Sequence, residues 1–396
     1  MTTVELRTTS MAVGGEAVAR EPSGRVVFVS GAAPDEVVRV EIDEEHRSFA
    51  RGTVVEVLEP SADRVVPPCP HRLAGCGGCD WQHITPDAQS RLRTDLVRAE
   101  LRKALRTDDP VVDRGPAVPG RDRTTVRGLA GPGGRFSYRR RRSNDPVPVD
   151  SCLVADPLVE EIIAEGSFGS AASVTIRVGA RTGERMVVVD GDTDEVEVPD
   201  DVVVVSESEL KAGHRAWLHE EAAGRRWRVS AQSFFQAGPA AAEALVDVVG
   251  AALAEHAPDG GTLVDLWSGV GLFAGTVGAG WSVVAVERSS SAVADARVNL
   301  AGADVRLVRS SVERWRSTRA DVVVADPARS GLRATGVRAI DRTGAKCCVA
   351  VHCDVGSLRR DTELMVSCGF EHRRSVTLDL FAHTGQVETV SLFTRS

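Results

Sequence analysis

The C-terminal part of the chain alternates short apolar runs with longer helical patterns. This alternation is typical of a sheet of buried strands flanked by helices. A helical pattern covers residues 239–256. The runs that follow it have strand length and little polar alternation, which indicates strands covered on both faces. They are residues 262–266, 281–286, 305–308, 321–325, 346–352, 375–380 and 387–393.

The first of these strands leads into the turn Ser268-Gly269-Val270-Gly271. Glycines let the backbone come close to a ligand. The second strand ends in Glu287, which is placed to accept hydrogen bonds from ribose hydroxyls. A dinucleotide fold would require a third glycine further on, and the chain has Leu-Phe-Ala there. The spacing Asp265-x-x-x-Gly-x-Gly instead resembles the first motif of class I S-adenosylmethionine methyltransferases.

The N-terminal residues 1–62 have a different pattern, with short β-rich runs separated by turns. Clear runs occur at 26–29, 36–40 and 52–57. Several short strands in sixty residues predict a small barrel of the oligonucleotide-binding (OB) kind. The run 14–20, from Gly-Gly to Ala-Arg, resembles the TRAM domain found on RNA-modifying enzymes. Such a barrel serves either RNA contact, which we favour, or protein docking.

Three cysteines lie close together after this barrel. Cys69, Cys76 and Cys79 fall within eleven residues, and two glycines separate the last two. This spacing indicates a metal site, which needs a fourth ligand if it is tetrahedral. Cysteine ligation suits either zinc or an iron–sulfur cluster, and spacing alone does not choose between them. Candidates for the fourth ligand are Cys152, His71 and His83.

Two further stretches between the barrel and the C-terminal part carry many arginines. Residues 86–106 predict an amphipathic helix, whose arginines form either a solvated face or an RNA face. Residues 139–142 are four consecutive arginines next to Phe136 and Tyr138. This run is either a grip for phosphates with a stacked base, or a hairpin with one charged face.

Composition places the chain among soluble globular proteins. Of 396 residues, 42% are apolar and 26% charged, and no apolar run has the length of a membrane span. The N-terminus lacks a signal-peptide pattern, so we expect a cytoplasmic protein with reduced cysteines. The net charge is −8, yet residues 91–142 hold 15 Arg or Lys against 6 Asp or Glu. A basic patch on an acidic chain favours RNA as partner.

Taken together, these motifs resemble the S-adenosylmethionine-dependent RNA uracil-5-methyltransferases. The closest branch has a TRAM barrel and an iron–sulfur cluster and acts on 23S rRNA. The resemblance covers nearly the whole chain. It rests on the cysteine run, Phe-Phe-Gln at 234–236, the Asp265 motif, Asp-Pro-Ala-Arg at 326–329, Cys353 and Val-Glu at 387–388.

The resemblance implies an α/β fold of three parts. They are a TRAM barrel (1–62), a mixed α/β central domain with the cysteine cluster (63–232) and a Rossmann-like class I methyltransferase domain (233–396). It also implies a monomer that acts on RNA, on rRNA rather than tRNA.

The resemblance gives Cys353 as nucleophile and Glu388 as base. C5 of uracil is too weak a nucleophile to attack a methyl sulfonium, and a thiolate that adds to C6 raises the electron density at C5. A base must then remove the C5 proton. Cofactor contacts implied by the family are Gln236, Trp267, Glu287, Ser311 and Asp326. The implied ligands of a [4Fe-4S] cluster, with zinc as the alternative, are Cys69, Cys76, Cys79 and Cys152.

Some residues depart from the family pattern. Asp354 follows the nucleophile where many relatives have Asn, and an adjacent carboxylate would raise the pKa of the thiol unless it is paired. His352 either offsets that charge or is incidental. Gly238 replaces an Asn, and Ser268 and Leu272 replace a Cys and an Asn. Two alternatives therefore stay open, a tRNA substrate or a catalytically silent RNA-binding protein.

Overall fold

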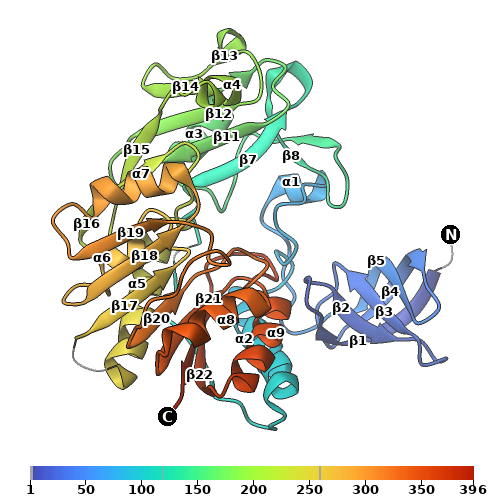
Figure 1. Ribbon diagram of the computed structural model, residues 1–396. Coiled ribbons are helices and arrows are strands. Elements are labelled where there is room, and N and C mark those ends of the chain that lie inside the picture. The colour runs from blue at the N-terminus through green and yellow to red at the C-terminus, as the bar shows by residue number, and fades with distance from the viewer. Residues whose placement is uncertain (1–2, 119, 258–259) are drawn as a thin grey trace.

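The computed structural model describes residues 3–118, 120–257 and 260–396. A small barrel, a central mixed sheet and a larger C-terminal sheet follow one another along the chain (Figure 1). The barrel lies to one side of the C-terminal sheet, and the segment with helix α1 (Pro70–Leu73) connects it to the central sheet.

The N-terminal strands close into the predicted barrel, with strand order β1-β2-β3-β5-β4. Alternate residues point inward, so that Val27 and Val29 are fully buried. Closure leaves the sheet without a free edge. The strands are β1 (Thr3–Met11), β2 (Ala17–Arg20), β3 (Val26–Ser30), β4 (Val37–Glu45) and β5 (Phe49–Glu59).

The central part is built on a six-stranded mixed sheet, in the order β14-β12-β11-β7-β8-β9. Helix α3 (Pro157–Glu165) contributes Val159, Ile162 and Ile163 to its core. A separate hairpin, β15 (Trp217–Ala222) and β16 (Arg225–Ser230), leads into the C-terminal part. The remaining elements are β7 (Thr125–Ala130), β8 (Phe136–Arg139), β9 (Pro146–Pro148), β10 (Ser167–Phe168), β11 (Val174–Val178), β12 (Arg185–Val189), β13 (Val196–Glu197), β14 (Val202–Ser206) and α4 (Glu207–Lys211).

The C-terminal sheet has the order β19-β18-β17-β20-β21-β23-β22-β6. All of its strand pairs are parallel except those of β23 with β21 and with β22. The predicted runs match the observed strands to within a few residues. The strands are β17 (Thr262–Leu266), β18 (Ser282–Glu287), β19 (Val305–Arg309), β20 (Val322–Ala325), β21 (Cys347–His352), β22 (Glu371–Leu378) and β23 (Glu388–Thr394).

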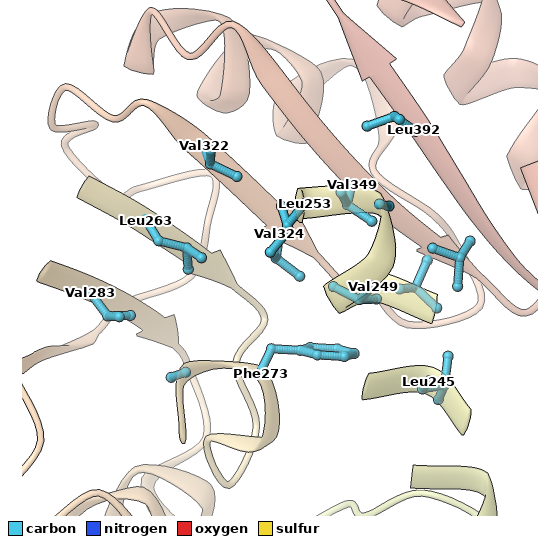
Figure 2. Packing of buried hydrophobic residues seen from close by; sticks show 14 of the residues in the cluster. Leu245, Val249, Leu253, Leu263, Phe273, Val283, Val322, Val324, Val349 and Leu392 are labelled. Carbon is cyan, nitrogen blue, oxygen red and sulfur yellow. The ribbon is translucent and has the colours of Figure 1, made fainter. Parts of the chain in front are cut away.

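Helices cover both faces of this sheet. On one face, Leu245, Val249 and Leu253 of α5 (Pro239–His256) pack on the β17, β20 and β21 side chains shown in Figure 2. On the other face, α8 (Arg333–Thr343) and α9 (Val355–Ser367) cover the alternate residues of the same strands. The buried strands thus have apolar side chains on both faces, as their sequence pattern predicts. Short helices α6 (Leu272–Gly275) and α7 (Ser290–Asn299) complete the layers.

Two elements from the predicted central segment lie on the C-terminal sheet instead. Strand β6 (Val112–Arg114) pairs in parallel with β22 and forms the sheet's last strand. Helix α2 (Pro86–Leu105), predicted at 86–106, packs on α9 through a cluster that includes Val97, Leu101 and Leu358. Arg91 and Arg102 of this helix are exposed, whereas Arg93 is buried. The three-part division of the chain stays a prediction.

Candidate active site

The strand order reverses between β17 and β20, which is where ligands bind in open α/β sheets. The carboxyl ends of these strands and their neighbours carry most of the predicted site residues.

The glycine turn after β17 is held against the tip of β18. Glu287 Oε2 accepts a hydrogen bond from the Gly269 amide at 3.1 Å, and Oε1 accepts one from the Ser289 amide at 2.6 Å. Gly271 has a φ of 96°, and a Cβ there would lie 2.8 Å from Leu300. Trp267, next to the turn, also has a positive φ, of 58°. These contacts fix the carboxylate of Glu287 beside the turn, with its position set by backbone amides.

Asp265, in the same motif, is fully buried under the turn. Its Oδ2 accepts a hydrogen bond from the Ala274 amide at 3.0 Å, and its Oδ1 has no partner among the described residues. Burial raises the pKa of Asp265 to about 8, and the nearby acids Asp326 and Glu287 add to the effect. The Asp265 carboxyl is therefore a neutral group at pH 7 that links strand to helix.

The loop before α5 brings Gln236 to the end of β20. Gln236 Nε2 donates a hydrogen bond to Asp326 Oδ2 at 3.2 Å. The loop is held from the central part, because the Thr124 amide donates to the Ala237 carbonyl at 2.8 Å. Asp122 Oδ2 accepts from the Ala241 amide at 3.2 Å, at the first turn of α5.

This arrangement explains why residue 238 is a glycine. A Cβ at Gly238 would lie 2.1 Å from the Asp122 carbonyl oxygen. The side chain that caps the helix start therefore comes from Asp122 rather than from residue 238. Neither Asp122 nor Thr124 was found from the sequence, because they lie more than a hundred residues before the loop they hold and carry no motif.

Cys353 and Glu388 both adjoin the last pair of the ladder between β21 and β23. That pair is His352 with Thr389, so Cys353 directly follows β21 and Glu388 begins β23. Glu388 is 5% exposed, whereas Cys353 is partly exposed.

These two groups and Asp326 influence one another electrostatically. Burial raises the pKa of Cys353 to about 12, and the charges of Glu388 and Asp326 add to it while Arg329 opposes them. Burial and Asp326 also raise the pKa of Glu388 well above its usual range. Burial raises the pKa of Asp326 to about 6, opposed by the hydrogen bond from Gln236. The site thus joins one thiol and two carboxyls whose proton affinities are all increased.

The carboxylate next to the thiol does not contribute to this effect. Asp354 is the N-cap of α9, where its Oδ1 accepts from the Ser357 amide at 2.8 Å, and its Oδ2 lies 3.7 Å from Arg329 Nε. It is therefore paired. His352 does not offset it, because the His352 ring is buried and its Nε2 lies 3.2 Å from Asp361 Oδ2, in the core. Of the two interpretations of His352, one that offsets the Asp354 charge and one that is incidental, the structure favours the second.

Ser311 lies in the loop after β19, where its carbonyl accepts from the Arg314 amide at 3.1 Å and the Trp315 amide at 3.0 Å. The preceding residue, Ser310, donates its amide to the Glu287 carbonyl at 3.0 Å. This places the Ser311 loop beside the tip of β18, on the same edge as the glycine turn.

The four predicted cluster cysteines line one cavity of about 400 Å³ in the central part. All four are free thiols, and Cys69 and Cys152 are buried. Burial raises the pKa of Cys79 to about 11, with a contribution from Cys152. In the chain outside residues 1–2, 119 and 258–259, no group of three or more His, Cys, Asp or Glu is arranged to hold a metal ion. The structure thus brings the four cysteines to one cavity.

The arginine run at residues 139–142 makes contacts between the barrel and the central part. Arg142 Nη2 donates to Glu16 Oε1 at 2.6 Å, and Arg141 Nη1 donates to Ser30 Oγ at 3.0 Å. Of the adjacent aromatics, Phe136 is fully buried and cannot stack a base. Tyr138 is partly exposed, and its hydroxyl donates to Cys152 Sγ at 3.5 Å. Arg141 and Arg142 dock the hairpin on the barrel, whereas Arg139 and Arg140 are exposed.

Comparison with known proteins agrees with this architecture. A TRAM-domain family model matches residues 3–55. An RNA methyltransferase of Streptomyces avermitilis is 34% identical over 416 residues, with 96% of each chain covered. The 23S rRNA (uracil(1939)-C(5))-methyltransferase RlmD of Halomonas elongata is 30% identical, covering 98% of this chain and 89% of its own.

Among solved structures, the tRNA (uracil-54, C5)-methyltransferase of Pyrococcus abyssi, in complex with S-adenosyl-L-homocysteine, shares the fold. It has a TM-score of 0.75 at 20% identity and covers 99% of this chain and 100% of its own.

A TRAM barrel followed by a class I methyltransferase fold defines an RNA-modifying methyltransferase. The chain belongs to the S-adenosylmethionine-dependent RNA uracil-5-methyltransferase family. Within the described residues, no helix is both long and apolar enough to cross a membrane.

Proposed function

We propose that this enzyme transfers a methyl group from S-adenosylmethionine to C5 of one uridine in structured RNA. The observation that supports the proposal is that Cys353 and Glu388 adjoin the last pair of the β21–β23 ladder, and that the charge of Glu388 acts on the Cys353 thiol. The similarity to RlmD of Halomonas elongata favours 23S rRNA over tRNA. The protein acts as a monomer in this proposal.

The reaction requires two acts from the chain's own residues. The Cys353 thiolate adds to C6 of the uracil, and the electron pair pushed to C5 takes the methyl group, with loss of S-adenosylhomocysteine. Glu388 then takes the C5 proton, and the electrons of that C–H bond re-form the C5–C6 double bond and expel the thiolate. The raised pKa of Glu388 makes its carboxylate a stronger base for this step. The target uridine must leave its stack to reach the thiol.

In the proposal, the positively charged sulfonium of the methyl donor binds next to Asp326, Glu388 and Cys353. The charges of Asp326 and Glu388 disfavour the thiolate form of Cys353. A cation bound next to them opposes that effect and favours the thiolate. In the proposal, Gln236 and Asp326 contact the methionyl part and Glu287 the ribose. Trp267 and Ser311, on the same edge, complete the cofactor contacts.

We further propose that Cys69, Cys76, Cys79 and Cys152 hold a [4Fe-4S] cluster. In support, the four thiols line one cavity. Four cysteine ligands suit such a cluster, with zinc as the alternative. The cluster would brace the segment between barrel and central sheet. Purified protein should be brown and contain iron, and a colourless, zinc-loaded, active preparation would contradict the assignment.

The proposed division of labour follows the three parts of the chain. Residues 1–62 contact RNA, residues 63–232 carry the cysteine cluster and a basic surface, and residues 233–396 bind the cofactor. In this proposal the catalytic groups act on one RNA held between the parts, and the cysteine cluster has a structural role.

The decisive test compares Cys353→Ala with Cys368→Ala, a matched change at the end of α9. We expect Cys353→Ala to abolish methyl transfer to rRNA from a strain lacking the gene, while calorimetry shows unchanged cofactor binding. Cys368→Ala should keep full activity. Normal turnover by Cys353→Ala would remove the thiol from the mechanism. If the enzyme methylates tRNA but not rRNA, the proposed rRNA substrate is wrong and tRNA is the substrate.

A further inference from the structure

Arg93 of helix α2 is buried in the interface with the C-terminal sheet, at 2% exposure. Its guanidinium binds the loop between β22 and β23, residues 379–387, which ends immediately before Glu388. Nη1 donates to Asp379 Oδ1 at 2.9 Å, and Nη2 donates to the Phe381 carbonyl at 2.9 Å and to the Thr384 carbonyl at 2.8 Å. One side chain therefore binds three points of the loop.

Trp81, just after the cysteine run, binds the same loop and also the barrel. The Trp81 amide donates to the His383 carbonyl at 2.8 Å, and its Nε1 donates to the Gly15 carbonyl at 2.9 Å. The Arg93 guanidinium lies over the Trp81 ring, 5.6 Å from its centroid. A Cβ at Gly385 would lie 2.8 Å from the Gly15 Cα, so loop and barrel touch by backbone.

These contacts are needed by the loop itself. A segment outside regular secondary structure must satisfy its buried carbonyls by other means, and here Arg93 does so. Replacing a buried Arg leaves those carbonyls and Asp379 without their donor, which is costly in a dry interface. The loop's conformation, and with it the start of β23, thus depends on Arg93 and on the packing of Trp81.

We infer that Arg93 and Trp81 are positioning residues that set Glu388 against the C5 proton. Proton removal thereby depends on the barrel and the cysteine segment being docked. The inference rests on the proposed function, because it concerns the step assigned to Glu388. The two residues touch neither RNA nor cofactor in this role. They act through the 379–387 loop.

The inference predicts that the release of the methylated RNA from Cys353 is the step that slows. Before release, C5 of the adduct carries both a hydrogen and the new methyl group, and C6 is bonded to Cys353 Sγ. Release moves the C5 proton to Glu388 and breaks the C6–S bond. A misplaced Glu388 slows this step alone, so the methylated covalent adduct accumulates. A displacement of ~1 Å costs on the order of 10²-fold in rate.

The experiment is single-turnover reaction of the full-length enzyme with rRNA, with the SDS-stable protein–RNA adduct followed over time. We expect Arg93→Gln and Trp81→Phe to slow adduct release by about tenfold or more. Adduct formation should stay near the wild-type rate. Arg93→Lys should not rescue, since one ammonium lacks the planar fork of donors. Arg102→Gln, an exposed change on the same helix, serves as the matched control.

Equal loss of formation and release in Trp81→Phe, or no change in any variant, would overturn the inference. Trp81→Phe removes one hydrogen bond and keeps an aromatic ring, so it remains informative if Arg93→Gln fails to fold. Glu388→Gln separates the two proposals. If it accumulates adduct and the positioning variants do not, only the positioning inference falls. If it turns over normally, Glu388 is not the base and both fall.

Discussion

Asp295 of α7 can be used to test what stabilises the loop that leads to Gln236, a proposed cofactor contact. The residue is fully buried and its two oxygens accept four hydrogen bonds. Oδ1 accepts from Arg228 Nε at 2.8 Å and from Ser230 Oγ at 2.7 Å. Oδ2 accepts from the Ser230 amide at 2.8 Å and from Ser233 Oγ at 2.6 Å. These donors lie at the end of β16 and in the loop that continues to Gln236.

The change Asp295→Asn keeps the shape and replaces one oxygen by an amide group. Hydroxyls of Ser230 and Ser233 can rotate to accept from that group. Each oxygen of Asp295, however, also faces an N–H that cannot rotate, either the Arg228 Nε–H or the Ser230 amide. One of these becomes unsatisfied, at about 1–3 kcal/mol, and loss of the charge-assisted bond to Arg228 adds about 1.5–3 kcal/mol. We expect a total loss of about 2.5–6 kcal/mol.

The assay is urea unfolding followed by tryptophan fluorescence, to which Trp227, buried in strand β16, contributes. Asp247→Asn, an exposed change on α5, provides the control and should leave stability within about 0.5 kcal/mol of wild type. We also expect weaker cofactor binding by Asp295→Asn in calorimetry, since the loop with Gln236 loses its anchor at Ser233.

A loss below about 1 kcal/mol for Asp295→Asn would refute the reasoning. It would mean that the four donors find other acceptors, and that the loop does not depend on this carboxylate. A large loss of stability with unchanged cofactor affinity would refute only the link to Gln236.

Three further predictions concern other parts of the molecule. Asp265, with a pKa of about 8, keeps its proton in the folded state where the unfolded chain, with an ordinary value of 3.8, releases it. Its contribution to stability is therefore lost as pH rises from about 4 to about 8, and Asp265→Asn should flatten the decline of urea midpoints over that range. Cys353, with a pKa of about 12, should react with iodoacetamide far more slowly at pH 7.5 than a small free thiol, and mass spectrometry should show the rate still rising at pH 10. Equal rates would contradict the burial of the thiol. Glu16→Gln weakens the contact with Arg142 and should cost about 1.5–3 kcal/mol of barrel docking, seen as faster proteolysis between barrel and central part.

The strands of the C-terminal sheet could be predicted because their signal is local. An apolar run, a glycine turn and an acid at the next strand's tip all lie within a stretch such as 262–287, and the structure agrees there. The assignment of helix 86–106 was likewise close, since Pro86 and the leucine spacing mark it. What the helix packs on was not predictable, because β6 and α2 find their partners far along the chain.

For the arginine run at residues 139–142, the sequence does not reveal whether the neighbouring aromatic rings are exposed. Four arginines beside Phe136 and Tyr138 look the same in sequence whether the rings are exposed or buried. Strand alternation and the packing of the central sheet bury Phe136, and Glu16 of the barrel takes up the charge of Arg142. Similarly, nothing adjacent to Gly238 reveals that Asp122 reaches across to cap α5.

The position of β6 as the last strand of the C-terminal sheet has a consequence for synthesis on the ribosome. Val112 pairs with Ser375, so this strand and α2 emerge about 260 residues before the strand they join. At roughly 5–20 residues per second, they wait for about 10 to 50 s with their apolar side chains uncovered. The first half of the chain must therefore be kept from aggregating until the last strands arrive. For the same reason, a fragment starting at residue 233 lacks a strand of its own sheet and is not a self-sufficient methyltransferase.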